Sequence, residues 1–366
     1  MKSFPLKSIS IEEAMGKQFK LVDCIASNFK GEEILSSGDL GIHQPENEPV
    51  TTSKVEKVIA DFFGQEKAIL VRGAGTGALR YSLSACFKPN DKVLVHKAPI
   101  YSTTQTSFEM FGLIPVYADF NNLDNVKTVL SDKEIKGALI QHSRQVIEDS
   151  YDLGEVIKTI KDVNADLPIV IDDNYAVMKV KKIGCELNGD LSAFSSFKLQ
   201  GPVGIGVVVG KEEYINKIRK MHYSGGCQVQ GYEAMEVLRG LIYAPVMLAI
   251  TAMEAEKVLA ELKNGTIKEI NDAYIANAQS KVLLISFNEP IARKVLENAN
   301  KLGALPYPAG AESKYEMVPL FYKVSGTFLK KDPSLIDYMI RVNCNRAGKD
   351  TVIRILKEAI RMTKEG

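Results

Sequence analysis

Residues 167–209 read LPIVIDDNYAVMKVKKIGCELNGDLSAFSSFKLQGPVGIGVVV, and this stretch decides the fold class. Its three short apolar runs, at 167–172, 191–197 and 203–209, are typical of strands that are buried on both faces of a sheet. Asp172 ends the first run, and Lys198 directly follows the second. Because open α/β sheets bind ligands at the carboxyl ends of their strands, we expect a functional site at this edge.

Upstream of this stretch, apolar runs alternate with helical patterns, which indicates parallel βαβ units. The expected strands are 67–71, 92–96, 114–118 and 137–141, and the expected helices are 75–87, 102–111 and 153–162. A long helical pattern at 232–262 leads into expected strands at 281–287 and 337–343 and expected helices at 291–304 and from residue 350 onwards. The sequence therefore predicts an α/β protein with a three-layer α/β/α large domain, built on a mainly parallel sheet, and a smaller C-terminal α/β domain.

The chain has 366 residues, more than one compact core usually holds. We expect an N-terminal arm at 1–50, the large domain at 51–260 and the small C-terminal domain at 261–366. Because the first fifty residues are weakly patterned, we expect an extended arm that packs on the large domain or on a partner subunit.

Charge and composition exclude several classes of function. The formal net charge is +1, which gives no long-range field to attract nucleic acid or an anionic membrane. We expect no apolar run to be long enough to span a bilayer, and the N-terminus lacks the apolar core of a signal peptide. The five cysteines are odd in number and far apart, as in reduced cytoplasmic proteins, and the four histidines show no metal-binding spacing. We expect a cytoplasmic protein with no metal, nucleic-acid or membrane partner.

A glycine-rich turn joins the strand at 67–71 to the following helix. Gly75, Thr76 and Gly77 lie where that helix begins, and a helix N-terminus offers unpaired N–H groups to an anion such as phosphate. A tight turn without a ligand is the alternative. The segment Gly73–Ala78 also resembles a dinucleotide fingerprint, as in an NADP-dependent oxidoreductase. That interpretation requires an acid after the second strand, where the chain has His96 and Lys97.

Lys198 follows a buried strand, where an ammonium group is costly to bury. A lysine with a lowered pKa is a nucleophile for an aldehyde and forms a Schiff base with it. Asp172 would face a pyridine nitrogen and keep it protonated, whereas Asp173 points the other way in an extended chain. The alternatives are a lysine that reaches solvent from a strand end and an aspartate that caps a turn.

The order of these features, a phosphate-type turn, then Asp172, then the Ser-x-x-Lys of SSFK, resembles the fold-type I pyridoxal-phosphate enzymes of the aspartate aminotransferase superfamily. The resemblance covers roughly residues 52–365 and is greatest to the cystathionine-γ-synthase and methionine-γ-lyase branch, including the aluminium-resistance proteins. It implies pyridoxal 5′-phosphate as the cofactor, bound to Lys198 as an internal aldimine, with the ring nitrogen on Asp172.

The same resemblance implies further roles around the cofactor. Gly75, Thr76 and Gly77 correspond to the phosphate loop, to which Ser195 would add its hydroxyl. Tyr101 corresponds to the aromatic residue that stacks on the ring. His142 stands where relatives have an arginine, and it either contacts the phenolic oxygen of the cofactor or lies in a loop.

Arg341 corresponds to the arginine that clamps the substrate carboxylate, with Arg346 as the alternative. The implied activity is a reaction at Cα of an amino acid, either elimination by a lyase of the C–S type or transamination, with racemisation also open. A homodimer or tetramer is implied as well. A pyridoxal-phosphate-binding regulator without turnover remains the non-catalytic alternative.

Overall fold

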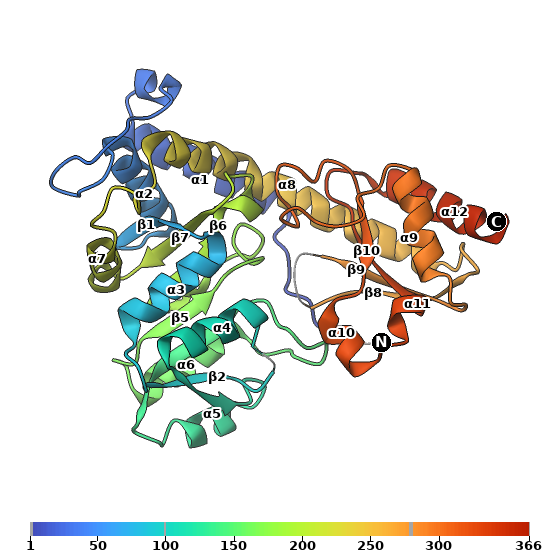
Figure 1. The fold of residues 1–366 in the computed structure, drawn as a ribbon, viewed down its shortest axis with the longest axis horizontal. Coiled ribbons are helices and arrows are strands. Elements are labelled where there is room, and N and C mark those ends of the chain that lie inside the picture. The colour runs from blue at the N-terminus through green and yellow to red at the C-terminus, as the bar shows by residue number, and fades with distance from the viewer. Residues whose placement is uncertain (1–2, 99, 278–280, 366) are drawn as a thin grey trace.

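The computed structural model describes residues 3–98, 100–277 and 281–365, which form two units that lie side by side (Figure 1). The larger unit contains a seven-stranded sheet and the smaller a four-stranded sheet. In spatial order, the large sheet consists of β1 (Lys67–Arg72), β7 (Ile205–Gly210), β6 (Leu191–Ser195), β5 (Ile169–Asp172), β4 (Ile135–Gln141), β2 (Lys92–His96) and β3 (Ile114–Ala118).

The large sheet is mainly parallel, as the sequence predicts. Strands β6, β5, β4, β2 and β3 run parallel to one another, whereas β7 runs antiparallel to both β6 and β1. In the dinucleotide-binding fold, the first strand lies at the centre of a parallel sheet. Here β1 lies at the edge and pairs antiparallel, so the strand order does not match that fold.

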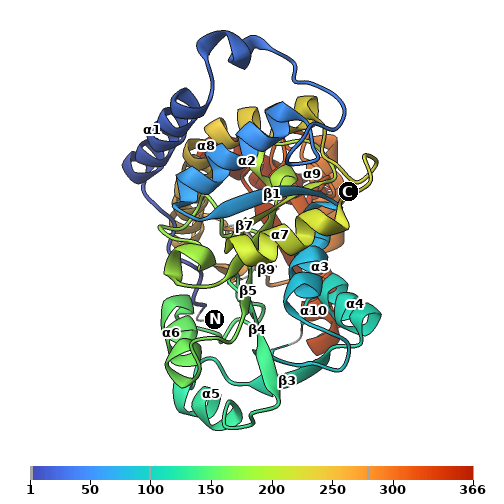
Figure 2. The same cartoon turned by 90° about the vertical axis from the view of Figure 1, so that its left-hand side faces the viewer.

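Helices cover both faces of the large sheet and give the expected three layers. The helices of this unit are α1 (Ile11–Asn28), α2 (Val50–Phe63), α3 (Ala74–Cys86), α4 (Ser102–Phe111), α5 (Leu123–Val129), α6 (Leu153–Val163) and α7 (Glu212–Met221). Figure 2 shows α3, α4 and α7 on one side of the sheet and α5 and α6 on the other. The two cores alternate along β1, where Ile69 and Val71 pack under α3 while Ala68 and Leu70 pack under α2. This alternation is what a strand buried on both faces requires.

The smaller unit is an antiparallel sheet with helical residues packed on both faces. Its strands, in spatial order, are β10 (Leu320–Lys323), β11 (Met339–Asn343), β9 (Leu283–Phe287) and β8 (Ile270–Ile275). Its helices are α9 (Ala292–Lys301), α10 (Gly326–Lys331), α11 (Leu335–Tyr338) and α12 (Lys349–Glu365). The core lies between the sheet, α9 and α12. The opposite face of the sheet is turned towards the large domain.

Helix α8 (Gly231–Lys263) connects the two units and belongs to both cores. Its first half packs with α1 and α2, and its last turns pack on the small sheet. By length and composition alone α8 could cross a membrane, contrary to the expectation that no apolar run is long enough to do so. However, 61% of its most apolar stretch is buried inside the protein. Packing between the two cores accounts for this apolar character. The expected domain boundary near residue 260 thus falls within a helix that the domains share.

The N-terminal arm was expected to be extended, but residues Ile11–Asn28 form the helix α1. Ser10 caps this helix: its hydroxyl accepts from Glu13 N at 3.1 Å, and Glu13 Oε2 accepts from Ser10 N at 2.9 Å. Helix α1 packs against α8 and α2. The segment before it reaches the small domain, where Ser3 Oγ donates to Ile275 O at 2.7 Å.

Candidate active site

A cavity of about 210 Å³ lies between the carboxyl edge of the large sheet and the inner face of the small sheet. The large domain contributes Ala74, Gly75, Thr76, Leu79, Tyr101, Thr103, Gln141, Ser143, Gln145, Asp172, Asn174, Tyr175 and Lys198 to its lining. The small domain contributes Ala276, Val282, Leu284, Ser325, Phe328 and Arg341. One cavity therefore brings together six of the predicted site residues, which are distant in sequence: Gly75, Thr76, Tyr101, Asp172, Lys198 and Arg341.

Strand register explains why the polar residues meet. Gln141 at the end of β4 pairs with Asp172 at the end of β5, which pairs with Ala193 in β6. The carboxyl ends of these parallel strands therefore lie at one edge of the sheet. Lys198 follows in a single 3₁₀ turn, η3 (Ser196–Leu199), directly after β6.

The carboxylate of Asp172 is held facing the cavity. Its Oδ1 accepts from Asn174 N at 3.0 Å and from Asn174 Nδ2 at 2.8 Å. Burial raises the pKa of Asp172, and the Asn174 hydrogen bonds and the nearby Lys198 ammonium oppose that rise. Asp173 is fully buried and binds His142 Nδ1 at 2.6 Å and Gly184 N at 3.1 Å. Because Asp173 does not line the cavity, Asp172 is the carboxylate available to a ligand.

Lys198 has the environment of a reactive amine. Burial lowers its pKa, while the carboxylates of Asp172 and Glu312 favour the charged form. Its Nζ lies 4.6 Å from the centre of the Tyr175 ring. Among the residues that the structure describes, Lys198 forms no hydrogen bond or ion pair. A buried amine that can lose its proton and has no fixed partner is suited to attack an aldehyde.

The first turn of α3 forms the expected glycine-rich end of the cavity. Gly73 has φ of 95°, in the left-handed region that favours glycine, and Gly75 and Thr76 line the cavity. A Cβ on Gly75 would lie 2.4 Å from the Asn174 side chain. Gly77 has another role, since a Cβ there would lie 2.0 Å from Arg72 O and would prevent α3 from packing on β1. First-turn N–H groups have no helical acceptor, so those of Gly75 and Thr76 can bind an anion.

Of the other expected cofactor contacts, Tyr101 lines the cavity, whereas Ser195 and His142 do not. Tyr101 lies at the start of α4, about half exposed, and lines the cavity. Ser195 is only 2% exposed and lies behind the cavity wall, where its backbone N donates to Asn174 Oδ1 at 3.1 Å. His142 is buried against Asp173 and also lies behind the wall. Asn174, which links Asp172 to Ser195, was not expected from the sequence.

Arg341 is the cationic residue that the small domain presents to the cavity. Its guanidinium stacks on the Tyr322 ring at 3.9 Å, and its Nε donates to Lys323 O at 2.8 Å. Burial lowers its pKa, and among the described residues it has no carboxylate partner. Arg346 instead binds Gln200 Oε1 at 2.8 Å and Ser313 O at 2.9 Å, outside the cavity lining. Of the two candidates, Arg341 is therefore the one placed to bind a carboxylate.

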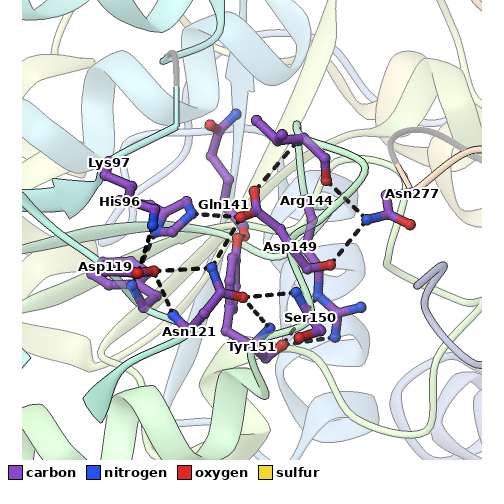
Figure 3. Close-up of polar contacts among 12 residues, drawn as sticks. His96, Lys97, Asp119, Asn121, Gln141, Arg144, Asp149, Ser150, Tyr151 and Asn277 are labelled. Atoms are coloured by element: carbon purple, nitrogen blue, oxygen red, sulfur yellow. Dashed lines mark hydrogen bonds and ion pairs between the residues drawn. The ribbon is translucent and has the colours of Figure 1, made fainter. Parts of the chain in front are cut away.

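A polar network fixes the loop that follows β4 (Figure 3). His96 Nε2 lies 3.0 Å from Asp149 Oδ1, which also accepts from Asn121 Nδ2 at 3.0 Å. Asn277, beyond β8 in the small domain, donates to the carbonyls of residues 146, 147 and 149 at 2.8–2.9 Å. Tyr151 donates its hydroxyl to Gln141 O. The network holds the loop that presents Gln141, Ser143 and Gln145, and joins it to the small domain.

Comparison with known proteins identifies this arrangement. The family model described as aminotransferase class-V matches residues 42–272, and one described as the YhfS-like C-terminal domain matches residues 256–356. The chain belongs to the aminotransferase class-V family. This result confirms the resemblance to fold-type I enzymes that the sequence suggests. The uncharacterized protein YhfS of Escherichia coli K12 is 52% identical to this chain over 360 residues, 98% of this chain and 99% of that protein.

Solved structures share the fold of this chain. The crystal structure of E. coli YhfS, described as a pyridoxal-5′-phosphate-dependent protein, has a TM-score of 0.97 at 52% identity and covers 99% of this chain and 100% of its own. A putative cystathionine β-lyase involved in aluminium resistance, from Listeria monocytogenes, has a TM-score of 0.72 at 18% identity and covers 96% and 94% of the two chains. At that identity the likeness shows the shared fold alone.

The residues present fit a phosphorylated pyridine aldehyde. The cavity combines an amine without a fixed partner at Lys198, a carboxylate at Asp172 and an anion-binding helix start at Gly75 and Thr76. The close approach of Gly75 to Asn174 leaves no room for a larger side chain at the phosphate end. The aldehyde, the ring nitrogen and the phosphate of such a cofactor thus each have a complementary residue in the cavity.

Proposed function

We propose that this protein is a lyase that acts at Cα of a neutral amino acid, with pyridoxal phosphate held at Lys198. Pyridoxal phosphate is the cofactor, and when bound it supplies an electron sink for the bond that breaks at Cα. The observation that carries the proposal is that Lys198, Asp172 and Arg341 line one cavity between the two domains. Residues of the chain then bind the cofactor, orient the substrate and move protons.

Lys198 both anchors the cofactor and acts as the base. The buried amine has a lowered pKa and is neutral more often than a surface lysine. With a substrate bound, Lys198 Nζ would accept the Cα proton. Asp172, whose carboxylate is held by Asn174, would face the ring nitrogen of the cofactor and favour its protonated form. Arg341 binds the substrate carboxylate through two parallel hydrogen bonds and so fixes the position of Cα.

The side-chain end of the cavity is uncharged in the described residues. Leu284 pairs with Arg341 across β9 and β11, so the two side chains lie next to each other on one face of the small sheet. Ala276, Val282 and Phe328 extend this apolar wall. An acidic or basic side chain would lose water there without gaining a partner. The wall therefore favours a substrate with an apolar side chain, such as a thioether.

Elimination and transamination share these first steps. The fold shared with a putative cystathionine β-lyase supports elimination, and the match to the aminotransferase class-V family supports transamination. A local likeness to a cysteine desulfurase of Wigglesworthia glossinidia brevipalpis spans 24% of the chain at 32% identity. Among the described residues no cysteine lines the cavity, so no thiol is placed to accept sulfur from a substrate.

We also propose that the protein acts in the cytoplasm as a homodimer. Exposed apolar side chains gather where residues 35–42 lie along the loop before α8, and they include Leu35, Leu40, Ile42 and Tyr223. The two segments are joined by Gly41 N, which donates to Gln230 Oε1 at 2.9 Å, and by the contact of Ile42 with Gly225. An apolar surface of this kind is suited to a second copy of the chain.

The deciding experiment has two stages. Borohydride reduction of the yellow protein followed by peptide mapping should place the cofactor label on Lys198, and a label on another lysine would refute the assignment. A panel of amino acids is then scored for release of ammonia with a keto acid, which indicates elimination, and for dependence on an added keto acid, which indicates transamination. A yellow protein whose spectrum responds to no amino acid would indicate the non-catalytic regulator.

A further inference from the structure

A buried ion pair lies directly behind the cavity, and neither of its residues has a role in the proposed reaction. Lys179 and Glu312 form an ion pair in which the side chains are 9% and 2% exposed. Lys179 follows β5 in the large domain, whereas Glu312 lies between α9 and β10 in the small domain. The pair therefore crosses the domain interface at a buried position, where a charge needs a specific reason.

Tyr175 lies between this pair and Lys198. Its ring centre is 4.6 Å from Lys198 Nζ and 5.3 Å from Lys179 Nζ, so both amines contact the same ring. Tyr175 lines the main cavity and also a small void of about 20 Å³ that Lys179 and Glu312 line from the other side. The ring is thus a thin wall between the reactive amine and the ion pair.

The loop that carries Glu312 is held in an unfavourable backbone conformation. Glu312 has φ of 111° and Ala311 has φ of 53°, values that are rare for residues other than glycine. The loop is ordered by the buried carboxylate of Glu316, whose Oε1 accepts from the backbone N of residues 309, 310 and 311 at 2.6–3.0 Å. Such strain persists only where the surroundings impose it, and it is common at functional sites.

The same loop is fastened to the turn that carries Lys198. Gln200 Nε2 donates to Glu312 O, and Gln200 Oε1 accepts from Arg346 at 2.8 Å. A Cβ on Gly310 would lie 2.4 Å from the ring of Phe197, which shows how closely the loop approaches η3. The position of the Glu312 carboxylate relative to Lys198 is therefore fixed from both sides.

We propose that Glu312 is a positioning residue for Lys198. Lys179 anchors the Glu312 carboxylate, which stabilises the Lys198 ammonium across the Tyr175 ring. Because Glu312 belongs to the small domain, this stabilisation depends on the packing of the small domain against the large one. The inference rests on the proposed function, because it concerns the amine that holds the cofactor. Its physical basis is that a carboxylate near a buried ammonium stabilises the charged form. Burial raises the pKa of Glu312, while Lys179, Arg346 and Lys198 oppose that rise. One oxygen of the carboxylate, Oε1, has no hydrogen-bond partner among the described residues, so its charge is not fully compensated locally.

The test measures how fast the full chain, freed of cofactor, captures added pyridoxal phosphate at a series of pH values. Only the neutral amine reacts, so the midpoint of the rate profile reports the pKa of Lys198. Glu312→Gln keeps the shape and removes the charge, and it should lower the midpoint by on the order of one pH unit. Glu312→Asp keeps the charge and should leave the midpoint near that of the unmodified protein while lowering the melting temperature.

Lys161→Met is the matched control. Lys161 pairs with Asp190, with exposures of 11% and 1%, in a similarly buried pair away from the cavity. This variant should lose stability without moving the midpoint. If Glu312→Gln leaves the midpoint in place, or if Glu312→Asp moves it equally, the inference is wrong. Borohydride mapping of each variant keeps the two questions separate, because a label on another lysine would refute the proposed function rather than the role of Glu312.

Discussion

Replacement of Arg341 by glutamine tests the substrate anchor most directly. Arg341 uses its Nε on Lys323 O, which leaves its two terminal nitrogens for a carboxylate. Each charge-assisted hydrogen bond contributes about 1.5–3 kcal/mol, so loss of the pair should cost about 3–6 kcal/mol. Because 1.4 kcal/mol corresponds to a factor of ten, the dissociation constant should rise about 100- to 10,000-fold. Arg341→Lys should recover only part of this loss, since lysine lacks the planar fork.

The assay follows the visible absorbance of the cofactor during titration with the best amino acid of the panel. Arg346→Gln is the control, because Arg346 binds Gln200 and Ser313 outside the cavity, and it should change the dissociation constant by less than about tenfold. A larger effect at Arg346 than at Arg341 would show that the carboxylate binds elsewhere. Retention of the absorbance in the free Arg341→Gln protein is also expected, because Arg341 holds the substrate and not the cofactor.

Two further predictions concern the phosphate end of the cavity and the pH dependence of stability. Gly75→Ala should weaken cofactor retention in equilibrium dialysis, because its Cβ would lie 2.4 Å from the Asn174 side chain. The control Gly16→Ala in α1 meets nothing within 4 Å and should raise the unfolding free energy by about 0.5–1 kcal/mol. Burial and the nearby Arg219 lower the pKa of His222 to about 4, so the unfolded chain binds its proton first and stability should fall by about 2 kcal/mol between pH 8 and pH 5. Urea unfolding should show this loss in the native protein and not in His222→Phe; an equal loss in both would exclude His222 as its source.

The sequence was informative where one physical pattern dominates. Strands that are buried on both faces of a sheet read as continuous apolar runs, so β5, β6 and β7 could be predicted, together with the positions of Asp172 and Lys198 at the ends of β5 and β6. Helix α1 was missed, although Ser10 and Glu13 carry the capping-box spacing that marks a helix start. Strands β8 and β10 were also missed, because β8 contains the polar residues Asn271 and Asp272 and β10 has only four residues.

Side-chain direction limits what sequence can say about a site. Gly75 and Gly77 are two residues apart in one motif, yet Gly75 lines the cavity while Gly77 allows α3 to approach Arg72 O. Ser195 precedes Lys198 by three positions and nevertheless lies behind the wall. Tertiary packing decides these directions, and no local pattern encodes it. Asn174 and Glu312 could not be found from sequence for the same reason, since their partners lie in distant segments.

The division of residues between the domains has a consequence for reaction specificity. The residues proposed to hold the cofactor, Lys198 and Asp172, come from the large domain, whereas Arg341 and the wall at Leu284 come from the small domain. In the proposed reaction Arg341 would fix the carboxylate and the wall would receive the side chain, so the small domain would determine the orientation of the substrate. Because α8 runs unbroken through both cores, the two sets of residues are held in one fixed relation. The fate of the substrate should therefore respond to changes in the small domain that leave the bound cofactor untouched.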